Sequence, residues 1–236
     1  MARLFGTDGV RGIANDSLTP ELAYHLGRAA AYIFGQNKEH PTFLIGRDTR
    51  RSGTMLADIL AAGIASAGGD CYMVGVIPTP AIAYLTRTHH MDAGVMISAS
   101  HNPFEYNGIK FFDGFGYKLP DETEDKIEEC MLKDERAALQ SRPTGAAIGT
   151  ISTWTDLQQE YADFICKSTD VDLSGLKVVH DGANGSASVL GPEILKRLGA
   201  EVIAIHHEPN GININDNCGS THLESLKETV LKYGAD

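Results

Sequence analysis

Short apolar runs alternate with amphipathic stretches along most of the chain. Four runs have the length of buried strands: residues 42–45, 71–76, 93–97 and 108–112. Four stretches beside them repeat apolar positions at helical spacing: residues 20–33, 55–67, 81–88 and 120–132. Strands that alternate with helices form parallel sheets covered on both faces. The pattern therefore predicts an α/β fold with mostly parallel, mixed sheets.

The same order returns in the second part of the chain. Residues 176–180 and 201–205 are expected strands, and residues 186–198 are the expected helix between them. Amphipathic patterns also predict helices over residues 154–167 and 223–233. We therefore expect repeated strand-helix-strand modules.

Residues 141–153 interrupt this alternation. They are poor in charge and contain Pro143, Gly145, Gly149 and several Ser and Thr, as linkers do. The interruption predicts two domains, residues 1–150 and residues 151–236.

Composition adds limits on compartment and partners. The 236 residues are 42% hydrophobic, which is enough for one large or two ordinary domains, and the net charge of −11 argues against a broad nucleic-acid or anionic-membrane surface. Residues 1–15 lack the apolar core of a signal peptide, so we expect a cytoplasmic protein without membrane partners. The cysteines are scattered and predict neither a disulfide framework nor a zinc site: Cys71, Cys130, Cys166 and Cys218.

The candidate chemistry lies directly after the apolar run at residues 93–97, in the segment Ser98-Ala99-Ser100-His101-Asn102-Pro103. Parallel sheets place ligands at the carboxyl edge, where this segment should emerge. The hydroxyl of Ser100 is a weak nucleophile that needs a base or a strong electrophile, and His101 and Lys110 are the nearest bases. An ordinary polar turn is the alternative, since Ser, Asn and Pro dominate turns.

Two further polar segments suit an anion site. Residues 5–12 place three glycines around Asp8 and Arg11, which suits a tight turn near an anion, although a flexible entry has the same composition. Arg47, Asp48 and Arg50 follow the strand at residues 42–45, as support for the site or as a solvated loop that caps a helix.

These motifs resemble those of a known group of enzymes. The run SASHNP, together with Asn107-Gly108-Ile109-Lys110, resembles the active-serine loop of the α-D-phosphohexomutase superfamily. The opening FGTDGVRG, the segment GRDTR-x-SG and the loop NIN-x-x-CGSTH resemble those of the phosphoglucosamine mutase family within it. The resemblance covers nearly all of the chain, but only about half of a family member.

The resemblance implies a role for each matching residue. Ser100 would carry a phosphoryl group, Arg11 would face the phosphoserine, and His101 and Lys110 would lie near the sugar hydroxyl. Four residues would bind phosphate or support the loop: Asn102, Arg47, Asp48 and Arg50. Magnesium would bind the phosphate on Ser100, with its remaining ligands in an aspartate-rich loop expected beyond Asp236. A hexosamine 1,6-bisphosphate would be the activator, and a homodimer is left open as the assembly.

The activity implied is the interconversion of glucosamine 6-phosphate and glucosamine 1-phosphate, toward UDP-N-acetylglucosamine and cell-wall precursors. Phosphomannomutase or phosphoglucomutase activity is an alternative, and so is a non-catalytic two-domain fragment, because the metal loop is missing. A serine hydrolase is disfavoured because no G-x-S-x-G surrounds Ser100. Tyr106 stands where the family often has an acidic residue, while Ser100, His101, Asn102 and Lys110 match.

Overall fold

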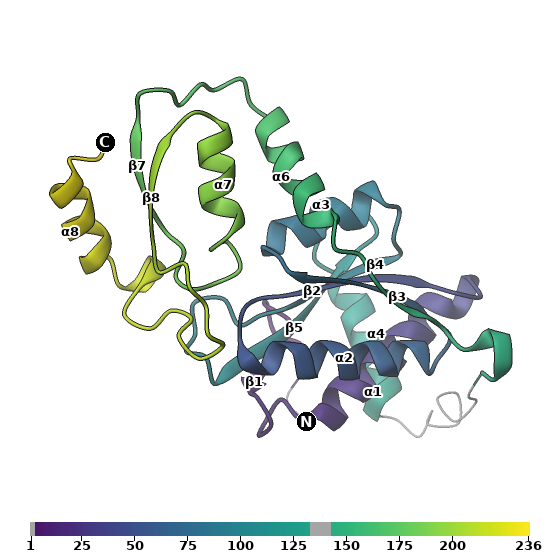
Figure 1. The fold of residues 1–236 in the computed structure, drawn as a ribbon. Helices are drawn as coiled ribbons and strands as arrows, with labels where there is room; N and C mark the ends of the chain where they lie inside the picture. Colours follow the sequence, from purple (N-terminus) through teal and green to yellow (C-terminus); the bar gives the residue numbers. More distant parts are fainter. Residues whose placement is uncertain (1–2, 133–142) are drawn as a thin grey trace.

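The computed structural model describes residues 3–132 and 143–236. Its first part is built on a six-stranded sheet with the order β1-β5-β4-β2-β3-β6 (Figure 1). The strands of this sheet are β1 (Val10–Ile13), β2 (Thr42–Arg47), β3 (Asp70–Val76), β4 (Ala93–Ile97), β5 (Tyr106–Asp113) and β6 (Ile151–Thr153). The four strands β4, β2, β3 and β6 are parallel, and β5 is antiparallel to both β4 and β1. The predicted α/β fold with a mostly parallel, mixed sheet is therefore confirmed.

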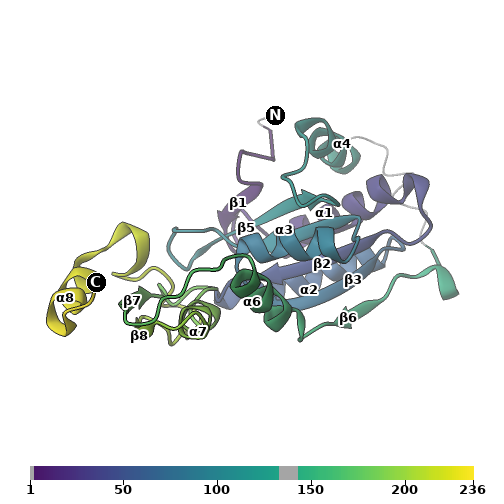
Figure 2. The same ribbon diagram turned by 90° about the horizontal axis from the view of Figure 1, so that it is seen from above.

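Helices cover both faces of this sheet (Figures 1 and 2). The helices of the first part are α1 (Pro20–Phe34), α2 (Arg51–Ala65), α3 (Thr79–Thr88) and α4 (Asp121–Leu132). Along β2, Phe43 and Ile45 face the core beneath α1 and α2, whereas Leu44 faces the core that α3 shares with α6 (Leu157–Lys167). Alternate residues of one strand thus enter two different cores, as the period of a pleated strand requires.

The second part contains a smaller parallel unit. Strands β7 (Lys177–Asp181) and β8 (Glu201–Ile205) pair in parallel, and α7 (Leu190–Arg197) connects them. Helix α8 (Glu224–Tyr233) contacts β7. The order β2-α2-β3 is thereby repeated as β7-α7-β8, as the spacing predicts.

Several element boundaries differ from the predicted ones. Residues 10–13 form β1 rather than only a tight turn, because antiparallel pairing with β5 makes them extended. Helix α2 begins at Arg51 instead of residue 55, and α3 includes Pro80, which fits the first turn because the backbone nitrogen there needs no partner. Helix α7 begins at Leu190 instead of residue 186, since Ser188 closes a turn onto Gly185.

The predicted linker at residues 141–153 is partly wrong. Residues 151–153 form β6, which pairs with β3 and extends the first sheet past residue 150. Residues 141 and 142 lie outside the described residues. The division into two domains at residue 150 stays a prediction. None of the helices in the described ranges is both long and apolar enough to cross a bilayer.

Candidate active site

The segment that contains Ser100 connects β4 to β5 at the carboxyl edge of the sheet. Ser98 donates its backbone N–H to the carbonyl of Gly108 at 2.9 Å, and Asn102 donates to Ala99 at 3.1 Å. We call residues 98–105 the serine loop. Ser100 lies within it at φ +56°, in the left-handed region that residues other than glycine rarely adopt. Such a conformation persists only where the surrounding contacts hold it.

Arg50, the residue directly before α2, provides many of these contacts. Its side chain is fully buried, and its Nη2 donates to the carbonyls of Ser100 and Asn102, both at 2.9 Å. Its Nη1 donates to the carbonyl of Pro103. One guanidinium therefore fixes three carbonyls of the serine loop, which uses the fork of donors that arginine alone possesses.

The buried charge of Arg50 is compensated by Asp48. The Asp48 carboxylate accepts hydrogen bonds from Arg50 Nε at 2.9 Å and from the Arg50 backbone N–H at 3.0 Å. It also accepts from the hydroxyl of Ser98 at 2.7 Å, and Ser98 Oγ accepts in turn from the backbone N–H of Ser100 at 3.1 Å. A continuous chain of hydrogen bonds thus connects a buried ion pair to the backbone of Ser100.

Two cavities meet at Ser100, and Ser98 and Thr79 also line both of them. The larger has a volume of about 410 Å³, and loops of the second part close it through residues such as Gly182, Ser186 and Ser220. The smaller has a volume of about 280 Å³ and is lined by Asp8, Arg11 and Lys110 from the first part. The serine hydroxyl is therefore placed where ligand groups can approach from two sides.

Two cationic side chains, Arg11 and Lys110, line the smaller cavity. Asp8 lies between them, with Oδ2 at 3.4 Å from Arg11 Nη2 and Oδ1 at 3.6 Å from Lys110 Nζ. Arg11 Nε is buried and has no hydrogen-bond partner among the described residues. A buried donor without a partner is costly, so an anion that accepts from Arg11 would be bound favourably. A phosphoryl group on Ser100 has the required charge and acceptor oxygens.

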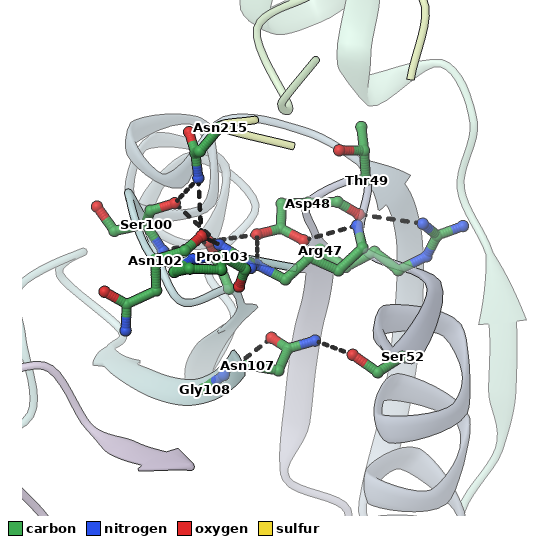
Figure 3. A network of polar contacts seen from close by, with 12 residues as sticks. Arg47, Asp48, Thr49, Ser52, Ser100, Asn102, Pro103, Asn107, Gly108 and Asn215 are labelled. Carbon is green, nitrogen blue, oxygen red and sulfur yellow. Dashed lines mark hydrogen bonds and ion pairs between the residues drawn. The ribbon is translucent and has the colours of Figure 1, made fainter. Parts of the chain in front are cut away.

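The structure brings most of the predicted site residues together. Arg11 and Lys110 share the smaller cavity with Ser100, and the exposed His101 lines the larger one. Asp48 and Arg50 support the serine loop through the buried hydrogen bonds described above. Asn102 contributes its backbone carbonyl to this network, while its side chain points away from Asp48 (Figure 3).

Arg47 is not placed with the others. Its Nη1 donates to the carbonyl of Asp48 at 3.1 Å, and its side chain lines a separate cavity of about 160 Å³ together with Asp58 and Met73. Arg47 is the last residue of β2, and its side chain leaves the strand away from the serine loop. Within the described part of the chain, the Arg47 side chain is connected to the serine loop through the backbone of Asp48.

Sequence reasoning missed several residues that shape the site. Ser98 was part of the motif but had no role, although it connects Asp48 to Ser100. Asn107 is buried at the start of β5, where Nδ2 donates to Ser52 Oγ at 2.9 Å and Oδ1 accepts from Gly108 at 2.8 Å. Asn107 opens the motif Asn107-Gly108-Ile109-Lys110, but the sequence assigned its side chain no role. Asn215 reaches the serine loop from the second part, and the motif NIN-x-x-CGSTH that contains it gave no sign of this contact.

The carboxylates around Ser100 do not fit magnesium. Magnesium takes near-octahedral oxygen ligands, commonly one or two carboxylates with phosphate oxygens and water. Asp8 is shared between Arg11 and Lys110, and Asp48 is saturated by the contacts described above. Asp181 accepts from the backbone N–H groups of Ala183 at 2.8 Å and Gly219 at 2.9 Å. The expectation that further ligands lie beyond Asp236 stays a prediction.

Within the described ranges, one cluster of three side chains has the residue types and the spacing that could bind a metal ion. Ligand atoms of Asp181, His206 and Cys218 lie within 4.8 Å of one another. Burial, followed by the charges of Asp181 and Asp216, raises the pKa of the Cys218 thiol to about 11, so it stays protonated at neutral pH. His206 Nδ1 lies 3.1 Å from Asp181 Oδ1. We assign this group a structural role, since Asp181 already ties the loops that carry the other two residues.

Comparisons with known proteins agree with this geometry. Residues 2–138 match the family model described as phosphoglucomutase/phosphomannomutase, alpha/beta/alpha domain I. The chain is 55% identical to a phosphoglucosamine mutase of Thermoanaerobacter sp. strain X514 and 56% identical to one of Desulforamulus reducens. All of this chain is aligned in both cases, with 52% and 53% of the relatives, so the chain spans about half the length of these curated relatives.

Solved structures show the same fold. A phosphoglucomutase/phosphomannomutase family protein of Burkholderia thailandensis superimposes with a TM-score of 0.80 at 26% identity, over 98% of this chain and 49% of that one. A protein from Thermus thermophilus described as a phosphomannomutase superimposes with a TM-score of 0.72 at 26% identity, over 89% of this chain and 47% of that one.

Proposed function

The chain belongs to the phosphoglucomutase/phosphomannomutase family, and from this premise we propose that Ser100 carries the phosphoryl group in a phosphosugar mutase. The observation that carries the proposal is the placement of Ser100 at the junction of two cavities, one of which holds Arg11 and Lys110. Phosphoryl transfer asks a protein mainly for positioning and for charges around the transferring group. The braced loop supplies the first, and the two cations supply the second.

The reaction we propose has two transfers. In the first, the bond between phosphorus and the Ser100 oxygen breaks, a bond from phosphorus to a hydroxyl oxygen of the sugar phosphate forms, and the proton of that hydroxyl leaves to a base. The Ser100 oxygen takes up a proton, so the products are a free serine hydroxyl and a sugar bisphosphate. In the second, the serine hydroxyl gives up its proton and takes the other phosphoryl group of the bisphosphate, and the sugar oxygen that loses this group takes up a proton. The phosphoserine is thereby restored, and the sugar phosphate with its phosphoryl group at the other position is released.

Residues at the cavity walls can hold the charges and protons of these steps. Arg11 and Lys110 would neutralise the phosphoryl oxygens. His101 and Lys110 are the groups beside Ser100 that can accept or return a proton. No side chain among the described residues hydrogen-bonds to the Ser100 hydroxyl, so the base-activated serine of a hydrolase has no support here. Magnesium, with ligands from elsewhere, would supply further charge neutralisation at the phosphate.

We propose glucosamine 6-phosphate as the substrate. The support is the name phosphoglucosamine mutase that relatives at 55% and 56% identity share, together with the loop at residues 213–222. Mannose and glucose phosphates are the alternatives, as the names of the more distant structural neighbours suggest.

The test uses a chimera, because the chain spans about half of its relatives. Residues 1–236 replace the matching part of the Thermoanaerobacter protein, and turnover is measured with the 6-phosphates of glucosamine, mannose and glucose plus the matching bisphosphates. We expect turnover that is highest with glucosamine 6-phosphate, and a peptide containing Ser100 that is heavier by one phosphoryl group. Ser100→Ala should lower turnover by at least about 1,000-fold and abolish this mass increase.

Ser168→Ala is the matched control, since this exposed serine at the end of α6 lies far from the site. This variant should keep both the turnover and the phosphoryl mass increase on the peptide that contains Ser100. If Ser100→Ala kept them as well, the covalent route through this residue would be refuted. If mannose or glucose 6-phosphate were the better substrate, only the choice of sugar would be wrong.

A further inference from the structure

The serine loop is held from two parts of the chain at once. Arg50 Nη2 donates to the carbonyls of Ser100 and Asn102 from the first part. Asn215 Nδ2 donates to the same two carbonyls from the second part, at 2.9 Å and 3.0 Å (Figure 3). A carbonyl oxygen has two lone pairs, and the side-chain amide nitrogen of asparagine has two N–H groups. The two carbonyls therefore each accept two hydrogen bonds, and both N–H groups of Asn215 are used.

Asn215 is itself fixed in this position. Its backbone adopts φ +60°, a left-handed conformation that asparagine tolerates better than most residues. Its backbone N–H donates to the carbonyl of Ala183 at 2.9 Å, in the loop that follows β7. The side-chain amide is thus presented to the serine loop by the folded second part and does not reach it as a flexible arm.

Two more hydrogen bonds join the parts beside Asn215. Thr49 Oγ1 donates to the carbonyl of Asn184 at 2.6 Å, and the backbone N–H of Arg51 donates to the carbonyl of Gly211 at 2.8 Å. Both come from the residues that flank Arg50. The loops of the second part therefore lie against the same short segment that braces the serine loop.

From this geometry we infer that Asn215 is a positioning residue, which makes the reactive conformation of Ser100 depend on the seating of the second part. The inference rests on the proposed function of Ser100 as phosphoryl carrier. Ser100 is in a left-handed conformation that needs external support. Arg50 supplies the support that is always present, and Asn215 supplies the support that is lost when the second part moves away.

A reciprocal effect follows from thermodynamic linkage. If seating of the second part favours one conformation of the serine loop, then any group on Ser100 that favours this conformation also favours seating. A phosphoryl group on Ser100 would in that way change how firmly the loop at residues 213–219 is held.

The chain contains a matched pair of residues for the test. Asn217 lies in the same loop and also has a left-handed backbone at φ +51°, and among the described residues its side chain donates only to Asp216. Replacing each asparagine by glycine removes the side chain without conflict at positive φ, so both variants carry the same backbone cost. The comparison of Asn215→Gly with Asn217→Gly isolates the two bonds to the serine loop.

Hydrogen exchange of the 236-residue chain is the first measurement. We expect Asn215→Gly to speed exchange of the Ser100 and Asn102 amides on the order of tenfold, because two neutral hydrogen bonds are lost. Asn217→Gly should leave these rates within about twofold. Unchanged exchange of the β2 and β4 amides in both variants shows that the sheet is intact. Equal rates in the two variants at Ser100 and Asn102 would overturn the inference.

The chimera gives the second measurement. Asn215→Gly should lower kcat on the order of tenfold and change KM for glucosamine 6-phosphate by less than about twofold, because the substrate still binds while the nucleophile is misplaced. Asn215→Asp, which keeps the shape but turns a carboxylate toward two carbonyls, should lower kcat at least as much. A higher KM with unchanged kcat would refute a positioning role. If Ser100 carried no phosphoryl group at all, the exchange result would still stand, so the two proposals fail separately.

Discussion

At the scale of single residues, the site is organised by one buried ion pair. Both residues of this pair belong to one segment in which the sequence offers three charged candidates: Arg47, Asp48 and Arg50. Burial separates them, because Arg50 is 1% exposed and turns to the serine loop, whereas Arg47 lines another cavity. The sequence could predict that this loop supports the site. It could not predict which arginine does so, because that depends on where each side chain leaves the end of β2.

Arg50→Lys tests the importance of the guanidinium fork. An ammonium keeps the charge beside Asp48 but cannot donate to three carbonyls in this geometry. We expect the free energy of unfolding to fall by about 2–4 kcal/mol, measured by chemical denaturation. Arg51→Lys is the control, since its exposed side chain has no such role and the change should stay within about 0.5 kcal/mol. Equal stability of the two variants would show that charge alone is what Asp48 requires.

Asn215 marks the limit of residue-level prediction. Its contact with Ser100 spans 115 positions in the sequence and ends on backbone carbonyls, which every residue possesses. The motif that contains Asn215 therefore gives no sign of its partner. That Ser100, His101, Arg11 and Lys110 line adjoining cavities could be predicted from their motifs, while the hydrogen bonds that hold the serine loop end largely on backbone carbonyls.

At the scale of elements, α1 and α2 approach one another through glycines. A Cβ on Gly27 would fall against the carbonyl oxygen of Leu60, and a Cβ on Gly63 would fall against that of Tyr24, both far inside contact distance. The apolar period predicted both helices. It did not predict their close approach, because a small residue in a helix can serve either packing or flexibility.

Gly27→Ala should separate the two helices. Alanine raises helix propensity by about 1 kcal/mol relative to glycine, but the backbone contact with Leu60 leaves no room for the methyl group. We expect a net loss of about 1–3 kcal/mol in the free energy of unfolding, measured by thermal and chemical denaturation. Gly35→Ala is the control, since its nearest neighbour would lie at 3.7 Å and its φ is −78°. Equal stability of the two variants would contradict the packing argument.

The errors in element boundaries have two causes. Strand β1 has no alternating pattern, since Arg11 and Gly12 interrupt it, and its pairing with β5, a tertiary contact, makes it a strand. Helix α2 begins earlier than predicted, directly after a local turn in which Asp48 accepts a hydrogen bond from the Arg50 N–H. A pattern of apolar positions records neither the pairing nor the turn.

At the scale of the whole molecule, the two parts of the chain differ in how deeply their parallel strands are buried. Strands β2 and β4 lie between helices on both faces and are almost entirely buried, whereas β7 and β8 are half-buried along most of their length. The sequence predicted both parallel units from the repeated order of elements. It did not predict this difference, because similar apolar runs occupy both.

Hydrogen exchange should reveal the difference directly. We expect amides in the β7–β8 pair to exchange on the order of 100-fold faster than those in the β2–β4 pair, because fewer buried contacts oppose local opening. Both pairs are parallel, so the geometry of their hydrogen bonds is matched. Equal protection of the two pairs would mean that the chain opens as one cooperative unit.

At Ser100 the residue type that best stabilises the left-handed backbone differs from the residue type that the proposed reaction requires. Glycine and asparagine suit this conformation better than serine does, so a search for thermostable sequences by design or directed evolution would favour replacement of Ser100, the proposed phosphoryl carrier. The surrounding brace of hydrogen bonds is then the means by which a costly serine is tolerated. Any programme that optimises this chain for robustness alone would discard the residue for which that brace exists.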